Sequence, residues 1–92
     1  MEKIKIGEIE YEVLENRGDM LDVEEVSSLM TDYFDSFDYV LGDYSYDKLR
    51  LKGFCSEDNP NFKEINDISG VKDYIENFCS YKANYFLLKK VK

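Results

Sequence analysis

Histidine and tryptophan are absent from this sequence of 92 residues, which contains only one proline, two cysteines and five glycines. Without histidine there is no imidazole to act as a general base near neutral pH or as a metal ligand. The sequence also contains no nucleophile paired with a base, no P-loop and no dinucleotide-binding glycine motif. We therefore expect a protein that is not an enzyme, with no catalytic residues, no metal site and no cofactor.

Long hydrophobic runs are missing as well, since nothing approaches the roughly 18 consecutive apolar residues that span a bilayer. The N-terminal stretch MEKIKIGEIEYEV alternates apolar and charged residues and does not resemble a signal peptide. These absences predict a cytoplasmic protein that does not enter a membrane. Cys55 and Cys79 are accordingly expected to be reduced core residues rather than a disulfide.

Negative charge is what the chain has in excess, with 20 acidic against 12 basic residues and a formal net charge of −8. Residues 1–47 contain 14 acids and 3 bases, whereas residues 48–92 contain 6 acids and 9 bases. A net negative charge disfavours general binding to a phosphate backbone, although the basic second half could still bind locally. The length predicts a single domain over residues 1–92, and eight Tyr and six Phe can fill its core.

The first half of the chain has the pattern of a hairpin followed by a helix. Residues 3–14 alternate apolar and charged side chains on both sides of Gly7, which predicts a β-hairpin with a two-residue turn. Asp22 is expected to cap a helix, with Glu25 completing a capping-box pattern. Apolar residues then recur at spacings of three and four as far as Phe37, which predicts one amphipathic helix of about four turns.

Residues 38–55 are predicted to form a second hairpin, with a polar, aromatic turn at residues 42–47. In its second strand, Leu49 and Leu51 alternate with cations at every second position, so one face is apolar and the other is basic. Residues 56–68 read as a polar loop, and Phe62 and Ile65 are expected to pin it to the body of the protein.

The end of the chain predicts a second helix and a last strand. Ser69 is expected to cap the helix, which runs to about Cys79. The strand from about Ala83 to Val91 has apolar residues on both faces, which favours an interior position in the sheet. The order β-β-α-β-β-α-β is typical of an α+β fold, here a mainly antiparallel sheet of about five strands with two helices packed against it.

Several stretches together resemble the YutD-like family of small bacterial proteins. They are DYVLGDYSYDKLRLKGF, then DYIENFC and NYFLLKK, with YEVLEN near the start. The resemblance spans about residues 4–90, and Tyr44 stands where the family usually carries Trp. It supports the fold and implies no particular activity. The resemblance also marks the polar and aromatic residues of the central hairpin as a shared feature.

The candidate partner-binding surface combines this central hairpin with the basic end of the last strand. Its residues are Asp43, Tyr44, Tyr46, Lys48, Arg50, Lys52, Phe54, Lys89 and Lys90. Arg50 offers a planar fork for a carboxylate or phosphate, and Phe54 on the same face could stack on a base. The alternative is a purely structural role, in which Arg50 and Lys52 pair with acids across the sheet.

Three functional hypotheses follow, and the first is preferred because polar and aromatic residues gather at one hairpin without a catalytic set. In the first, the chain is a non-catalytic interaction or adaptor module that binds a protein partner through residues 44–54. In the second, it is an RNA- or ribosome-associated factor that uses the basic residues of the candidate surface. In the third, the acidic residues of 8–47 mimic nucleic acid. The partner and the oligomeric state do not follow from the sequence.

Overall fold

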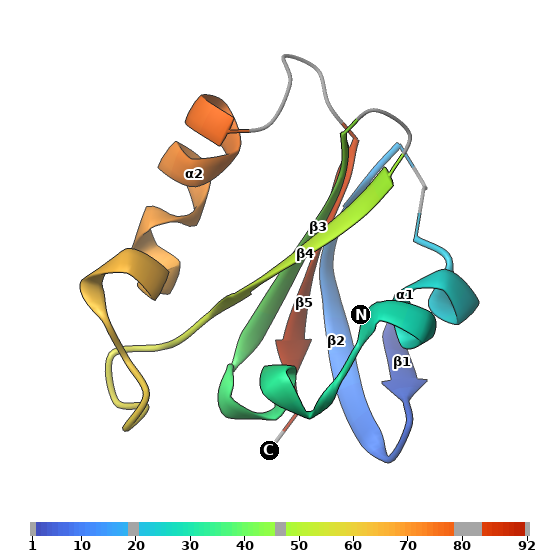
Figure 1. Cartoon of the computed structure of the whole chain (residues 1–92), viewed down its shortest axis with the longest axis horizontal. Coiled ribbons are helices and arrows are strands. Elements are labelled where there is room, and N and C mark those ends of the chain that lie inside the picture. Colours follow the sequence, from blue (N-terminus) through green and yellow to red (C-terminus); the bar gives the residue numbers. More distant parts are fainter. Residues whose placement is uncertain (1, 19–20, 46–47, 79–83, 92) are drawn as a thin grey trace.

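A five-stranded antiparallel sheet is the centre of the computed structural model, which describes residues 2–18, 21–45, 48–78 and 84–91. Its strands are β1 (Lys3–Ile6), β2 (Ile9–Arg17), β3 (Tyr39–Ser45), β4 (Lys48–Phe54) and β5 (Tyr85–Lys90). The strands lie in the order β1-β2-β5-β3-β4, so β5 is in the middle and β4 is at one end (Figure 1). The predicted α+β fold is confirmed.

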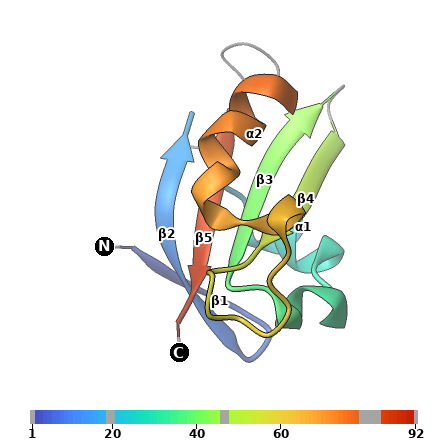
Figure 2. The same cartoon turned by 90° about the vertical axis from the view of Figure 1, so that its left-hand side faces the viewer.

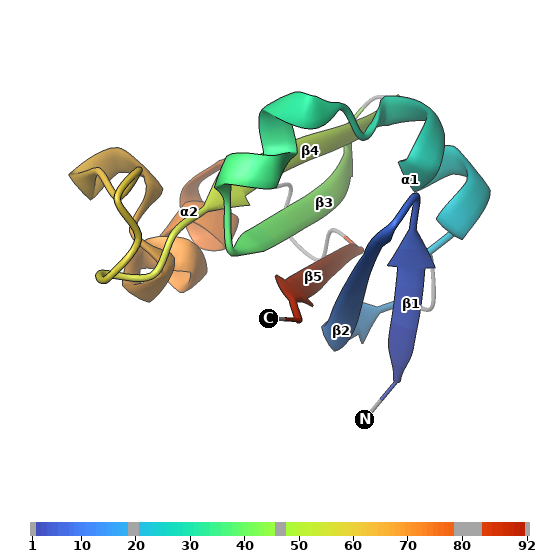
Figure 3. The ribbon, with the colours of Figure 1, turned by 90° about the horizontal axis from the view of Figure 1, so that it is seen from below.

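Helical segments cover both faces of this sheet. On one face lie α1 (Val23–Leu29) and the 3-10 helix η1 (Asp32–Ser36); on the other lies α2 (Val71–Phe78) (Figure 2). Two further 3-10 turns, η2 (Glu64–Asn66) and η3 (Ile68–Gly70), lead into α2. Seen from below, α1 and η1 run along the side of the sheet opposite to α2 (Figure 3).

The core is divided by the sheet into two clusters. Beneath α1 and η1, the buried residues are Ile6, Tyr11, Val13, Val26, Phe34, Val40, Phe86 and Leu88. Beneath α2, they are Leu41, Phe54 and Leu87, with Tyr74 and Ile75 of α2 packed against them. Successive residues of β5 therefore enter opposite clusters, as expected for an interior strand with apolar residues on both faces.

The first hairpin forms as predicted, and β2 continues beyond it to Arg17. Gly7 lies in its turn with a φ of 64°, a conformation that glycine adopts without strain. β2 pairs with β5 from Tyr11 to Arg17, with a register shift between Val13 and Glu15. The longer strand thus joins the hairpin to the centre of the sheet.

The predicted four-turn helix is wrong in its length, because the helix ends at Leu29 and a 3-10 helix follows. Asp22 does cap α1, and its carboxylate accepts hydrogen bonds from the backbone N–H groups of Glu24 and Glu25. Met30 and Thr31 are extended. Within α1, the hydroxyl of Ser28 donates to the carbonyl of Glu25 and so competes for the helix's own acceptors.

Two further expectations in the second half are corrected. Residues 42–45 belong to β3, so the turn is shorter than predicted, and residues 46 and 47 lie outside the described residues. Asp67 caps the 3-10 helix η3, which leads into α2, and its carboxylate accepts from the N–H of Ser69. Ser69 therefore lies inside η3 and is not the N-cap that was predicted. Asx residues often make this bond to the backbone two residues on.

Candidate functional site

A groove of about 710 Å³ runs beside the end strand β4. One wall comes from η1, with Tyr33 and Phe37, and the other comes from the loop at 61–66 and from Tyr74 of α2. Arg50, Leu51, Lys52 and Gly53 of β4 line it between these walls. The groove therefore contains part of the surface that the sequence nominated.

Arg50 is held by an acid within the sheet. It lies opposite Asp43 in the pairing of β3 with β4, and its Nη2 is 2.6 Å from Oδ2 of Asp43. The Asp43 side chain is 7% exposed, whereas that of Arg50 is 47% exposed. The alternative of pairing across the sheet is thus correct for Arg50. The Arg50 side chain remains partly exposed and lines the groove.

Lys52 and Phe54 lie on the face of β4 that α2 covers. Phe54 is buried and packs edge-to-face against Tyr74, with ring centroids 5.7 Å apart. The Nζ of Lys52 lies 5.3 Å from the centroids of both rings, a cation–π arrangement. The expectation that Phe54 is exposed for stacking is wrong, because the sequence pattern did not show that α2 covers this face.

Lys89 and Lys90 do not form one patch with the basic residues of β4. Lys48 is exposed at the start of β4, opposite Ser45. Lys89 and Lys90 belong to β5, which β3 separates from β4. They point to opposite faces because they are neighbours in a strand, and Nζ of Lys90 donates to the carbonyl of Asp35 at 2.8 Å. The expected extension of the basic surface through both lysines is therefore wrong.

Tyr44 ties the central hairpin to the first helix. Its hydroxyl donates to the carboxylate of Glu25 in α1. This hydrogen bond, followed by desolvation and the negative charges of Glu25 and Asp22, raises the pKa of Tyr44 to about 12. Tyr46, the other nominated tyrosine, lies outside the described residues.

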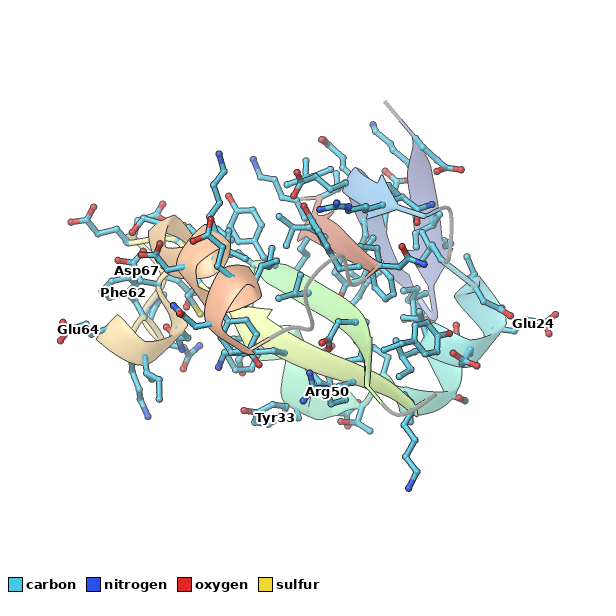
Figure 4. All side chains as sticks on the ribbon, turned by 90° about the horizontal axis from the view of Figure 1, so that it is seen from above. Glu24, Tyr33, Arg50, Phe62, Glu64 and Asp67 are labelled. Carbon is cyan, nitrogen blue, oxygen red and sulfur yellow. The ribbon has the colours of Figure 1, made fainter. Side chains whose placement is uncertain are left out.

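Sequence reasoning missed the most exposed apolar side chains around the groove. Tyr33 in η1 is 66% exposed and Ile65 in η2 is 78% exposed (Figure 4 shows Tyr33 close to Arg50). The sequence pattern places Tyr33 in the apolar stripe of one longer helix and predicts that Ile65 pins the loop to the body of the protein. Neither pattern signals exposure, because each residue has an ordinary apolar spacing.

The described residues contain a free thiol but no cluster of side chains that could bind a metal ion. The thiol of Cys55 is free and buried, as expected, and desolvation raises its pKa. Cys79 lies outside the described residues. Among residues 2–18, 21–45, 48–78 and 84–91, no group of three or more Cys, Asp or Glu side chains could hold a metal ion. No helix in those ranges is long and apolar enough to cross a membrane.

These features define a small α+β protein in which a groove borders the end strand of an antiparallel sheet. The family model described as "Putative antitoxin YutD-like" matches residues 5–89, and the chain belongs to this family. It is 33% identical over 89 residues to "Putative antitoxin YutD" of Bacillus subtilis (strain 168), covering 97% of this chain and 98% of that relative. The family description names no enzyme.

A solved structure supports the same fold. The solution NMR structure of protein yutD from B. subtilis superposes with a TM-score of 0.80 at 32% sequence identity. The match covers 100% of this chain and 84% of that chain. The resemblance stated from the central motif is thus confirmed along nearly the whole sequence.

Proposed function

We propose that this chain is a single-domain, non-catalytic, cytoplasmic module that binds a protein partner in the groove beside β4. The observation that carries the proposal is the exposure of Tyr33 and Ile65 on two sides of that groove. Exposed apolar side chains that gather at a concave surface are typical of protein-binding sites, and tyrosine is enriched among residues that dominate binding energy.

The description of a relative suggests what kind of partner the chain binds. The B. subtilis protein is described as a putative antitoxin. An antitoxin that acts on a protein toxin binds the toxin and blocks its activity. Such binding requires no catalytic residues and suits a small protein with a preformed groove. We therefore propose that binding at the β4 groove neutralises a protein partner.

RNA binding has less support from the geometry of the basic residues. Arg50 pairs with Asp43, Lys52 lies over two aromatic rings, and Phe54 is buried. The net charge of −8 opposes attraction to a phosphate backbone. No observation singles out the acidic residues of 8–47 as a nucleic-acid mimic.

The test compares affinity capture by the native chain with capture by Tyr33→Ser/Ile65→Gln, using lysate of the encoding bacterium. Leu29→Gln is the matched control, because Leu29 is 43% exposed on α1 and does not line the groove. We expect the groove variant to lose one protein that the native chain and the control both retain. Equal recovery of every protein by all three would contradict the proposal.

Neutralisation is then tested with the captured protein itself. Its expression alone is expected to arrest bacterial growth, and co-expression of the native chain or Leu29→Gln should restore growth. The groove variant should not restore it at an equal level of folded protein. A captured protein that never impairs growth would remove the antitoxin part of the proposal and leave only binding.

A further inference from the structure

Directly after β4, the backbone of Cys55 already forms hydrogen bonds at the outer edge of the sheet. The N–H of Cys55 donates to the carbonyl of Asn66 at 2.8 Å, and the N–H of Ile68 donates to the carbonyl of Cys55 at 3.0 Å. These bonds form a parallel bridge between Cys55 and Asp67. The backbone groups of Cys55 therefore point away from β3, toward the outer edge.

The same direction holds for every second residue before Cys55. In an antiparallel ladder, the N–H and C=O groups of alternate residues point to the same side. Leu51 and Leu49 thus direct their N–H and C=O groups outward, whereas Arg50 and Lys52 direct theirs to β3. In the part of the chain that the structure describes, the outward groups of Leu49 and Leu51 have no backbone hydrogen-bond partner. Gly53 also points outward but is buried, and a Cβ there would overlap the ring of Phe37.

The two sides of this edge differ in chemistry. Leu49 and Leu51 point to the α1 side, where Leu51 lines the groove together with Tyr33. Lys48, Arg50 and Lys52 point to the α2 side because side chains alternate along a strand. A strand added to β4 would therefore place its own side chains alternately beside an apolar surface and beside basic side chains, of which Lys48 is exposed, Arg50 is paired with Asp43 and Lys52 lies over two aromatic rings.

We propose that β4 accepts an extended segment of the partner protein as a sixth strand, and that this segment alternates acidic and apolar residues. Four backbone hydrogen bonds to Leu49 and Leu51 would hold it. Its carboxylates would lie beside Lys48 and Arg50, and its apolar side chains beside Leu51 and Tyr33. The inference rests on the proposed function and deepens it by naming the chemistry of the bound segment.

The cations argue against a second copy of this chain as the occupant. If two β4 strands paired antiparallel about Arg50, each Lys48 would face Lys52 of the other copy, and the arginines would face each other. Like charges directly opposite destabilise a strand pair. Charged residues on an edge strand are a known protection against self-pairing. An acidic segment would instead place its carboxylates opposite these cations, which favours pairing.

The test uses synthetic ten-residue peptides on the isotope-labelled native chain, followed by amide hydrogen exchange in NMR spectra. One peptide alternates Val and Glu, a second alternates Val and Lys, and a third has the first composition in blocks. We expect the alternating Val/Glu peptide to slow exchange of the Leu49 and Leu51 amides at least tenfold, with little change at Arg50 and Lys52. Equal protection by the Val/Lys peptide, or none by any peptide, would overturn the proposal.

Two charge variants keep the test independent of folding. Lys48→Glu and Lys72→Glu change the net charge equally, and both residues are exposed, but only Lys48 lies on β4. We expect Lys48→Glu to weaken binding of the Val/Glu peptide about threefold to tenfold relative to Lys72→Glu, since a favourable cross-strand pair becomes a repulsive one. Equal affinities of the two variants would overturn the charge assignment.

The outcomes separate the two proposals. If a partner is captured through Tyr33 and Ile65 but no peptide protects Leu49 and Leu51, strand addition is wrong and the proposed function stands. If the peptide protects both amides but no captured protein depends on the groove, strand addition is supported and the proposed function is wrong. If both amides are already protected in the free protein and this protection depends on concentration, a second copy occupies the edge and the inference is overturned.

Discussion

Gly42 and Phe86 lie opposite each other in the pairing of β3 with β5, and the Phe86 ring occupies the space that a side chain at position 42 would need. A Cβ on Gly42 would overlap that ring, and Phe86 is completely buried. Gly42 is thus needed for the close approach of an aromatic ring and has no positive φ that would mark a turn.

This relationship predicts that Gly42→Ala destabilises the protein by about 1–3 kcal/mol, because the ring must move in a packed core. Urea unfolding followed by circular dichroism would measure the change. Gly70→Ala is the matched control, since a Cβ there meets nothing within 4 Å and its φ is not positive. Equal stability of the two variants would show that the core adapts to the added methyl.

Gly42 also illustrates how far sequence reasoning reached. Alternation located both hairpins, because a period of two marks strands that bury one face. The last strand was located by its apolar residues on both faces, as expected for a strand that is covered on both sides. Alternation also grouped Lys48, Arg50, Lys52 and Phe54 on one side of β4. It could not show that α2 docks on that side, because this depends on contacts between distant segments.

The helical region shows a second kind of limit. Spacings of three and four residues fit both α1 and the 3-10 helix η1, so the apolar stripe continues through the break at Met30 and Thr31. Tyr33 belongs to the same spacing, yet it projects into the groove. The sequence therefore predicted the strand of the candidate site, β4. It did not predict the walls of the groove, which come from η1 and from the loop that carries Ile65.

Asp38 holds the loop after β4 through hydrogen bonds, so we expect its replacement to lower the stability of the protein. The residue is 6% exposed, and its Oδ2 accepts from the N–H and the hydroxyl of Ser56, both at 2.8 Å, and from Asn59 Nδ2 at 2.9 Å. Asp38→Ala leaves these donors without their acceptor, so we expect a loss of about 1–3 kcal/mol in the free energy of unfolding. Ser56→Ala removes one of the three bonds and should cost less. A larger loss for Ser56→Ala would contradict this assignment.

The hydrogen bond from Tyr44 to Glu25 predicts a pH dependence in the alkaline range. The bond favours the neutral phenol, so the pKa of Tyr44 in the folded protein, about 12, lies above its ordinary value of 10. The stabilisation is therefore fully present below pH 10 and is lost as the pH rises through 12. The difference between the tyrosinate absorbance titrations of the native chain and Tyr44→Phe should have its midpoint near pH 12. A midpoint near pH 10 would show that the bond does not persist in solution.

Arg50 and Asp43 are expected to be coupled in stability. Asp43 is almost fully buried in the sheet and its carboxylate is 2.6 Å from the Arg50 guanidinium, so Arg50→Ala leaves a buried charge without this partner. Because half of the Arg50 side chain is exposed, water can replace part of the interaction, and we expect a loss of about 1–2 kcal/mol rather than the larger loss of a fully buried pair.

Urea unfolding of Arg50→Ala, Asp43→Asn and the double variant completes a mutant cycle. The double variant should lose less stability than the sum of the two single variants, since neutralising Asp43 removes the charge that Arg50 balances. Strict additivity would mean that the pair is not formed in solution.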